Sequence, residues 1–408
     1  MHTHIVLAAG VIAVLLSPVR SLSQAVEPSV DTVLTRLTAQ ALAANPSLQV
    51  RQASARAAVS RIRAAGALPD PMLSVGVMDL TLPRFAFRES DFTEVDLEVS
   101  QEFPWPGSLA ARSGVARAQA RGATADVAAR RRAIVVRTAE LYYRLRYVVT
   151  ARATLQRQRR LLATAVEITT ARYATTAAPQ SDPLQARVAV ARLDAEDAAW
   201  AEQQAKSGAE LKALRNVRGS ERLTLELIRP ETVPFILHVA QPNSLPAHPR
   251  LVARRATLEA AERTVRVEQL AARPDFNITT RYGARPLGAD FFSAFLGIRV
   301  PLWGGRNLAG AARADADAAR AELAEETTEL EAELEAAHAA IGSGETRLRL
   351  LTTQVVPSAQ ATVEAVLRSY RVGQAPFLNV LAAEDSLYRA ELDAIMVAAE
   401  HLIHLVML

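Results

Sequence analysis

The sequence contains no cysteine, and only 5% of its 408 residues are aromatic. The missing thiols exclude disulfide bonds, thiolate metal sites, a cysteine nucleophile and lipid attachment through an N-terminal cysteine. Half of the residues are apolar but few are bulky, so the many alanines favour closely packed helices over a thick globular core. The net charge is only +4, from 47 basic and 43 acidic residues. The sequence has no continuous basic patch, so it does not predict nucleic-acid binding.

Signatures of catalysis and of cofactor binding are also missing. The chain has no phosphate-binding glycine loop and no nucleophile elbow. His401 and His404 lie three residues apart, a spacing that suits a shared metal ion but is more typical of a packed or solvated helix face. The glutamate-rich segment 325–337 is typical of an exposed coiled-coil flank. We therefore predict that the protein is not an enzyme and needs no cofactor or bound metal.

Long apolar runs are confined to the N-terminus. Residues 5–16 form an apolar core of signal-peptide length, too short for a membrane-spanning helix. We predict a signal peptide over residues 1–25, cleaved after Ala25 or, as a second option, Ser23. No later segment holds a run of apolar residues long enough to span a bilayer without interruption, so any insertion into a membrane is not by helices.

The mature chain consists of two copies of one unit. Pro301 follows Pro104 by 197 residues, and the same spacing separates Tyr370 from Tyr173. One spacing held over this distance indicates an internal duplication. The prediction is a first repeat, a proline-rich connector and a second repeat, at residues 26–217, 218–249 and 250–408.

Each repeat is predicted to contain two strands. In Glu94–Phe103 apolar and polar side chains alternate, a pattern that suits a soluble strand and a transmembrane β-strand equally. Four strands cannot close a barrel, and an open strand edge is not viable in lipid. Either the strands form a small soluble sheet, which the pattern alone favours, or three chains pool twelve of them. The predicted strands are residues 72–82, 94–103, 276–282 and 292–300.

Long helices follow the strands in each repeat. Residues 108–174 contain no proline, and a helix of this length spans on the order of 100 Å. The heptad spacing of a coiled coil is present there at Leu141, Val148 and Leu155. The pattern allows a soluble helical hairpin that acts as a spacer, or a helical tube that continues from the strands. The four helices are predicted over residues 108–174, 184–215, 308–370 and 377–406.

Three stretches carry a resemblance to a known family. LPDPMLSVGV begins the first strand, SQEFPWPG opens the first long helix, and SYRVGQAPFLNVLAAEDSLYRAEL lies near the C-terminus. In their order, doubling and spacing they resemble the TolC family of outer-membrane efflux proteins. The LPDP and FPWPG joints are most similar to the branch that serves heavy-metal efflux, the CzcC-like proteins.

This resemblance implies a mainly helical fold with a membrane β part, built from a duplicated strand–strand–helix–helix unit. Three chains would form a homotrimer in which each gives four strands to a twelve-stranded outer-membrane barrel, continued by a long helical coiled-coil barrel. The implied partners are a periplasmic membrane-fusion adaptor and an inner-membrane pump of the resistance–nodulation–division (RND) type. The implied location is the outer membrane of a Gram-negative bacterium, in contact with its lipid and extending into the periplasm.

The resemblance also places two helix-hairpin tips at residues 173–186 and 370–383, where members of the family contact the adaptor. The family's turn glycine is kept as Gly373, whereas the first repeat has Thr176, so the two contacts are expected to differ. Aspartate rings that close some members correspond here to Asn379 and Ala382. The tip and adaptor-contact candidates are Tyr173, Thr176, Asp182, Leu184, Tyr370, Gly373, Asn379 and Leu381.

The polar face of the second strand is expected to line the lumen of the implied barrel. There Asp96, Glu98 and Glu102 would favour cations over anions. Arg299, which follows Glu102 by 197 residues, would partly offset that charge. The alternative is that these acids are only the polar side of an exposed strand.

Two strand-to-helix joints are expected at the membrane–water boundary. Proline stops a strand because it cannot donate to the sheet, and tryptophan suits the depth of the lipid headgroups. The joint residues are Pro104, Trp105, Pro106 and Gly107 in the first repeat and Pro301, Trp303 and Gly304 in the second.

These features predict the outer-membrane channel of a tripartite efflux system that conducts its cargo passively, with heavy-metal cations as the suggested cargo. The alternative function is a secreted periplasmic helical scaffold or adaptor protein without a pore. An adaptor would carry a lipoyl-like or barrel module between its helix halves, whereas this chain has a strand pair ahead of each hairpin.

Overall fold

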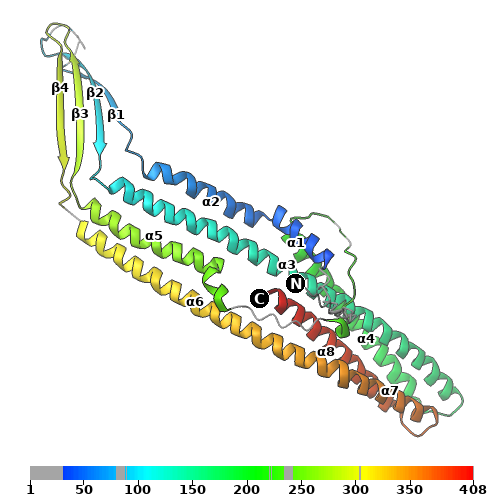
Figure 1. The fold of residues 1–408 in the computed structure, drawn as a ribbon. Coiled ribbons are helices and arrows are strands. Elements are labelled where there is room, and N and C mark those ends of the chain that lie inside the picture. The colour runs from blue at the N-terminus through cyan, green and yellow to red at the C-terminus, as the bar shows by residue number, and fades with distance from the viewer. Residues whose placement is uncertain are drawn as a thin grey trace, which may run out of the picture.

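The molecule is elongated, with a β-sheet at one end and helices over the rest of its length (Figure 1). The computed structural model describes residues 31–79, 88, 90–219, 221, 223–233, 242–302 and 305–407. The predicted signal peptide therefore lies outside the described residues. Within the described residues, no helix combines the length and the apolar character needed to cross a membrane.

The sheet joins the strand pairs of the two repeats. Its strands are β1 (Met72–Met78), β2 (Glu94–Phe103), β3 (Asp275–Ala284) and β4 (Phe291–Arg299), antiparallel throughout and in the order β1-β2-β3-β4. Within the sheet, the two repeats meet at the β2–β3 pairing. Within the described strands, β1 and β4 are the two edges.

The register places side chains of one kind on one face of the sheet. Val75 lies opposite Leu97, Leu97 opposite Tyr282, and Tyr282 opposite Phe292. Because side chains alternate along a strand, the acidic residues of β2 all lie on the other face. One face of the sheet is therefore apolar and the other polar.

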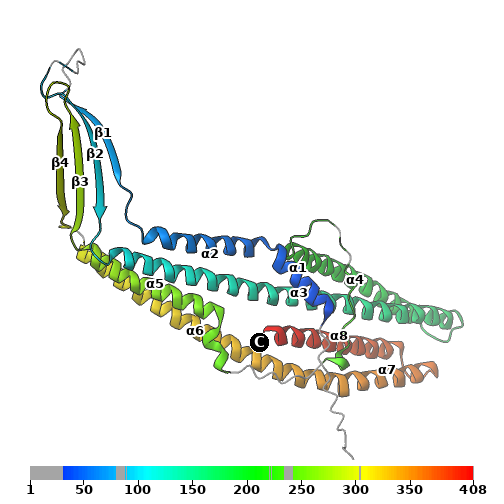
Figure 2. The same ribbon diagram turned by 45° about the horizontal axis from the view of Figure 1, so that its top comes forward.

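Four helices form a wall directly below the sheet (Figures 1 and 2). They lie side by side in the order α2 (Pro46–Ala65), α3 (Ser108–Ala174), α5 (Pro249–Ala271) and α6 (Gly305–Leu350). The short α1 (Thr32–Ala44) packs on the middle of α3. This order leaves α2 and α6 at the two sides of the wall, below the edge strands.

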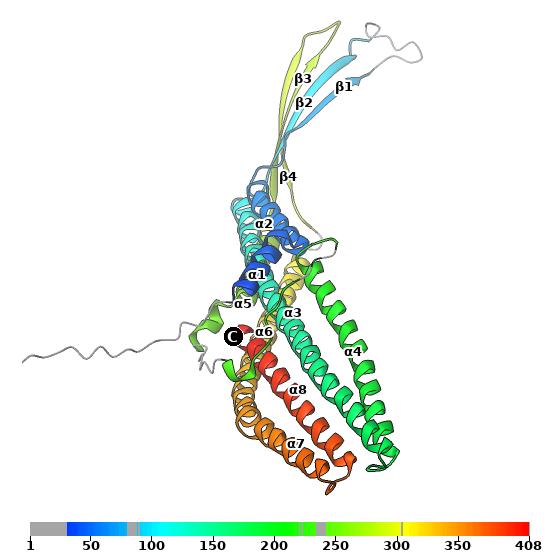
Figure 3. The same ribbon diagram turned by 90° about the vertical axis from the view of Figure 1, so that its right-hand side faces the viewer.

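The lower half is built from two helical hairpins. In the first, α3 turns into α4 (Ser181–Leu214), and in the second α7 (Val356–Arg371) turns into α8 (Phe377–Met407). Figure 3 shows the two hairpins ending at the same end of the molecule. The heptad residues Leu141, Val148 and Leu155 of α3 are all buried, as a coiled-coil seam requires. Between the repeats, the connector contains two short 3₁₀ turns, Pro230–Thr232 and Pro242–Ala247.

Several observed element bounds differ from the predicted ones. α4 begins at Ser181 rather than 184, because Pro183 lacks only an N–H that would have no helical partner in the first turn. β3 and β4 each differ from prediction by one or two residues at their ends. β1 ends before Asp79, whose φ of +52° leaves the extended region, and residues 80–82 of the predicted strand lie outside the described residues.

The predicted helix 308–370 is divided in the structure. It begins at Gly305, and a π turn at Leu351–Val355 separates α6 from α7. Above this turn the buried pattern of α3 recurs in α6 after 196 residues, since Ala116 and Ala120 correspond to Ala312 and Ala316. At the tips the spacing is 197 residues. A π turn accommodates one extra residue in a helix, so it accounts for the difference.

Candidate functional site

The acids predicted for the lumen lie together on the polar face of the sheet. Asp96 and Glu98 of β2 stand opposite Gly283 and Arg281 of β3, and Glu102 stands opposite Asn277. Asp96 is buried and Glu98 is half-buried. The structure thus brings the three predicted acids into one row along β2.

Arginines from the second repeat bind most of this row. Arg281 Nε donates to Asp96 Oδ1 at 2.8 Å, and its Nη2 donates to Glu94 Oε1 at 2.7 Å. Arg285, in the β3–β4 turn, binds the other oxygen of Glu94 at 3.2 Å. Arg299 binds Glu102 at 2.5 Å and also contacts Asp275. The expected offset of Glu102 by Arg299 is therefore a direct ion pair.

The charge on this face remains acidic after that pairing. Five carboxylates face three guanidinium groups, and Glu98 has no ion pair within the described strands. Glu94, Asp275, Arg281 and Arg285 were not predicted from the sequence. Their grouping depends on the β2–β3 register, which joins residues nearly 190 positions apart.

The opposite face of the sheet is apolar and open to its surroundings. Val75 is 72% exposed and Phe292 is 69% exposed. Such a wide exposed apolar face on a folded protein marks a surface that contacts lipid or another protein. Its other large members are Leu73, Val77, Val95, Leu97, Val99, Ile278, Tyr282, Leu296 and Ile298.

The first strand-to-helix joint is held by specific contacts. Trp105 donates its backbone N–H to Asp275 Oδ1 at 2.8 Å, and its ring stacks on Phe276 with 6.1 Å between centroids. Gly107 is the N-cap of α3 at φ +90°, a conformation that favours glycine. Pro104 and Pro106 flank the tryptophan and end β2. In the second joint Pro301 is exposed, whereas Trp303 and Gly304 lie outside the described residues.

The two hairpin tips have the same backbone. Thr176 has φ +56° and donates to the carbonyl of Tyr173 at 3.0 Å. Gly373 has φ +77° and donates to the carbonyl of Tyr370 at 3.0 Å. In each tip the next residue bonds back five positions, which completes a Schellman motif. Thr176 and Gly373 therefore differ in side chain but form the same turn.

The tips also contact each other through Tyr370. Its hydroxyl donates to Asp182 Oδ2 at 3.4 Å, and Arg172 donates to its carbonyl at 2.8 Å while stacking on its ring. Burial first, and then the Asp182 carboxylate, raises the pKa of Tyr370. The remaining candidates, Tyr173, Leu184, Asn379 and, in part, Leu381, are open to solvent.

Glu384 is a buried acid that was not among the predicted site residues. Glu384 of α8 is only 7% exposed, and Gln158 of α3 donates its amide to the carboxylate at 3.0 Å. Burial raises the pKa of Glu384, and the hydrogen bond from Gln158 offsets only part of that effect. Its position on a heptad-like helix gave no sign that α3 would cover it.

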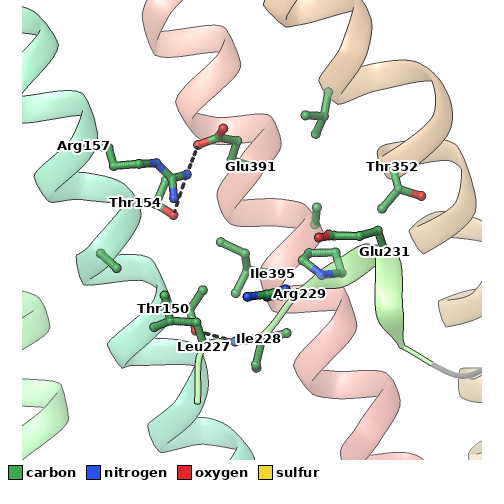
Figure 4. A pocket seen from close by; sticks show the side chains of 14 residues that line it. Thr150, Thr154, Arg157, Leu227, Ile228, Arg229, Glu231, Thr352, Glu391 and Ile395 are labelled. Atoms are coloured by element: carbon green, nitrogen blue, oxygen red, sulfur yellow. Dashed lines mark hydrogen bonds and ion pairs between the residues drawn. The ribbon is translucent and has the colours of Figure 1, made fainter. Parts of the chain in front are cut away.

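A hollow of about 400 Å³ lies where the connector crosses α3, α8 and the π turn (Figure 4). Its polar groups bind one another: Arg157 donates to Glu391 at 3.1 Å, and the N–H of Ile228 donates to Thr150 Oγ1 at 2.9 Å. The first contact joins α3 to α8, and the second fastens the connector to α3. Within the described residues, no three His, Asp or Glu side chains gather closely enough to hold a metal ion.

Comparison with known proteins identifies relatives over nearly the whole chain. The family model described as Outer membrane efflux protein matches residues 37–217 and 242–408. The solved structure of the outer-membrane channel OprN has a TM-score of 0.80 at 19% identity, covering 92% of this chain and 89% of that one. No curated protein matches significantly.

Two further solved structures show the same fold. The outer membrane protein VceC from Vibrio cholerae has a TM-score of 0.72 at 21% identity, covering 92% of this chain and 94% of that one. The open state of the Neisseria gonorrhoeae MtrE outer membrane channel has a TM-score of 0.69 at 18% identity, covering 92% and 87%.

The tips provide a matched pair of substitutions. Thr176→Gly is expected to stabilise the first tip, because a branched side chain in the left-handed region costs roughly 1–2 kcal/mol. Gly373→Thr is expected to weaken the second tip by a similar amount. Hydrogen–deuterium exchange of each tip would measure the change, about tenfold slower for Thr176→Gly and about tenfold faster for Gly373→Thr.

Thr175→Gly is the control, since Thr175 lies one residue earlier at φ −97° and gains nothing from glycine. Equal protection in Thr175→Gly and Thr176→Gly would contradict the assignment of strain to Thr176.

Glu384 should make stability depend on pH. The pKa of Glu384 is raised in the folded protein. Its contribution to the free energy of unfolding is therefore fully present below the ordinary pKa range of glutamate, and it is lost as pH rises through the raised pKa. Glu384→Gln keeps the size of the side chain and an acceptor for Gln158. The variant should unfold at higher denaturant concentration than the original protein at pH about 8, and at the same concentration near pH about 4.

Asp385→Asn is the matched control, because Asp385 is exposed and forms an ion pair with Arg389 of the next turn. A pH-independent effect of Glu384→Gln would show that burial of the charge is not the cause.

Proposed function

Because the chain belongs to the outer membrane efflux protein family, we propose that three copies form the outer-membrane channel of a tripartite efflux system. The observation that carries this proposal is the sheet: one face is apolar and exposed, the other is charged, and its outer strands are unpaired on one side. Three such sheets give twelve antiparallel strands, an even number that suits an outer-membrane barrel. The closed barrel would satisfy every strand edge.

In this arrangement the apolar face contacts lipid and the polar face lines the lumen. Asp96, Glu98 and Glu102 of each copy then give the lumen a net negative charge that their arginine partners reduce. The joint at Trp105 lies where the barrel meets the helical tube, at headgroup depth. The second joint, with Pro301, Trp303 and Gly304, would lie at the same level.

The far end of the tube is proposed to meet a periplasmic adaptor, which connects it to an inner-membrane pump of the RND type. Exposed apolar side chains at both tips support a protein contact there: Tyr173 and Leu184 in the first, Val372 and Leu378 in the second. Helices that extend from an outer-membrane barrel would cross the periplasm. The proposed location is therefore the outer membrane of a Gram-negative bacterium, with the tube in the periplasm.

The channel proposal predicts a detergent-requiring trimer from the outer membrane that conducts ions across a planar bilayer. Arg281→Gln should shift its selectivity toward cations, because Asp96 loses its arginine and Glu94 loses one of its two. Asp96→Asn should shift selectivity the opposite way. The reversal potential in a salt gradient measures the ion selectivity of each variant. A salt concentration near 0.1 M is suitable, because charges are then screened over about 10 Å. A soluble periplasmic monomer would instead support the scaffold alternative.

For the cargo we propose heavy-metal cations. The similarity of the LPDP and FPWPG joints to the CzcC-like branch supports this, as does the excess of carboxylates on the polar face. Deleting the gene should sensitise cells to divalent metals, and the original gene should restore growth. Sensitivity to organic compounds alone would refute the metal cargo while leaving the channel proposal intact.

A further inference from the structure

The wall of helices has two unpartnered sides, on α2 and on α6 (Figures 1 and 2). Along α2 only Leu48 is buried. This helix carries four arginines and no acid. On the other side, Asp317 of α6 is 73% exposed at its side chain, and its only ion pair among the described residues is with Arg320 on its own helix. The side on α2 is therefore basic, and Asp317 sets a negative charge on the side of α6.

The internal repeat gives a residue-by-residue correspondence between α2 and α5. Each helix begins with proline, Pro46 or Pro249, so the spacing is 203 residues. In each, the preceding side chain caps the helix: Asn45 accepts from the N–H of Ser47, and His248 accepts from the N–H of Arg250. Leu48 and Leu251 are buried at corresponding positions.

A second correspondence relates α3 to α6 at a spacing of 196 residues. The buried Ile134 of α3 corresponds to the buried Leu330 of α6, as the buried alanines nearer the sheet do. One contact in the first repeat has its counterpart in the second when both spacings are applied. Arg130 of α3 bonds Ser47 of α2 at 2.7 Å, and the corresponding residues, Glu326 and Arg250, bond at 2.6 Å.

Within the wall, the two repeats of one chain meet where α3 packs on α5. A Cβ on Gly122 would lie 3.4 Å from the Cβ of Ala256, so the helices approach closely there. One turn away, Arg121 forms an ion pair with Glu259. By the two spacings, Gly122 and Ala256 correspond to Ala318 and Ala53.

The same correspondence assigns partners to the unpartnered charges. Arg121 corresponds to Asp317, and Glu259 corresponds to Arg56. An ion pair is therefore possible between α6 and α2 of different copies, with the two signs exchanged relative to the pair within the chain. Arg320, which now contacts Asp317, would keep its second partner, Glu262.

We propose that α6 of one copy packs on α2 of the next, with Ala318 against Ala53 and Asp317 paired with Arg56. This inference rests on the proposed function, since it takes several copies around one channel as given. The contact continues the wall from chain to chain, directly below the pairing of edge strands. The exchanged signs also select the partner, because a wrong pairing of Asp317 with Glu259, or of Arg56 with Arg121, sets like charges together.

The absence of cysteine allows a direct test. Ala53→Cys with Ala318→Cys, oxidised in the outer membrane, should link most chains into covalent dimers and trimers on a non-reducing denaturing gel. The expectation follows from the 3.4 Å Cβ separation at the corresponding pair inside the chain, close to disulfide geometry. Gly122→Cys with Ala256→Cys is the positive control and should link within single chains only.

Gln52→Cys with Ala318→Cys is the negative control, since Gln52 lies about 100° around the helix from Ala53. Equal linking by this pair, or trimers without linking by the Ala53 pair, would overturn the proposed contact and leave the channel proposal standing. Failure to find any oligomer of the original protein would refute the channel proposal and this contact with it.

Charge reversal gives an independent readout on the intact trimer. Arg56→Glu and Asp317→Arg should each lower the temperature at which the trimer dissociates. The double variant should recover more than half of the loss, because the pair is restored with its signs exchanged. Additive losses in the double variant would overturn the pairing of Arg56 with Asp317.

Discussion

The sheet is open at both edges and apolar on one face, and this combination limits the surroundings in which the molecule is stable. In water, a wide apolar face is unfavourable, and in lipid the unpaired N–H and C=O groups of an edge strand are unfavourable. In the proposed barrel, pairing β4 of one copy with β1 of another satisfies the edges, and lipid around the closed sheet covers the apolar face. The helices repeat the same geometry, because α2 and α6 stand below the two edge strands (Figure 1). In the proposed channel, the backbone of the edge strands and the side chains of α2 and α6 therefore meet the neighbouring copies at the same two sides.

Local chemistry predicted the elements of this fold well. Prolines and Gly107 marked the end of β2 and the start of α3, and the heptads of α3 marked a buried seam. Contacts between distant segments could not be predicted in this way. Arg281 and Arg285 are ordinary residues in the sequence, and only strand register shows that they bind Glu94 and Asp96. Burial of Glu384 likewise depends on which helix covers it.

The tips and the π turn show how the two repeats have kept one backbone while changing their residues. Thr176 and Gly373 occupy the same left-handed position in the same hydrogen-bonded turn. The second repeat has one more residue between the wall and the tip, and the π turn at Leu351–Val355 absorbs it. Without that turn, each residue below it would be rotated by about 100° around the helix. The hairpins would then lose their common seam.

The charges at the sides of the wall have a consequence for the duplication itself. In the first repeat both flanking positions, Arg56 and Arg121, are basic, and in the second both, Glu259 and Asp317, are acidic. A ring of six first repeats would set arginine against arginine at each junction, and a ring of six second repeats would set carboxylate against carboxylate. Only alternation pairs opposite signs throughout. In the proposed ring the two repeats are therefore complementary parts, because neighbours of one kind would set like charges together.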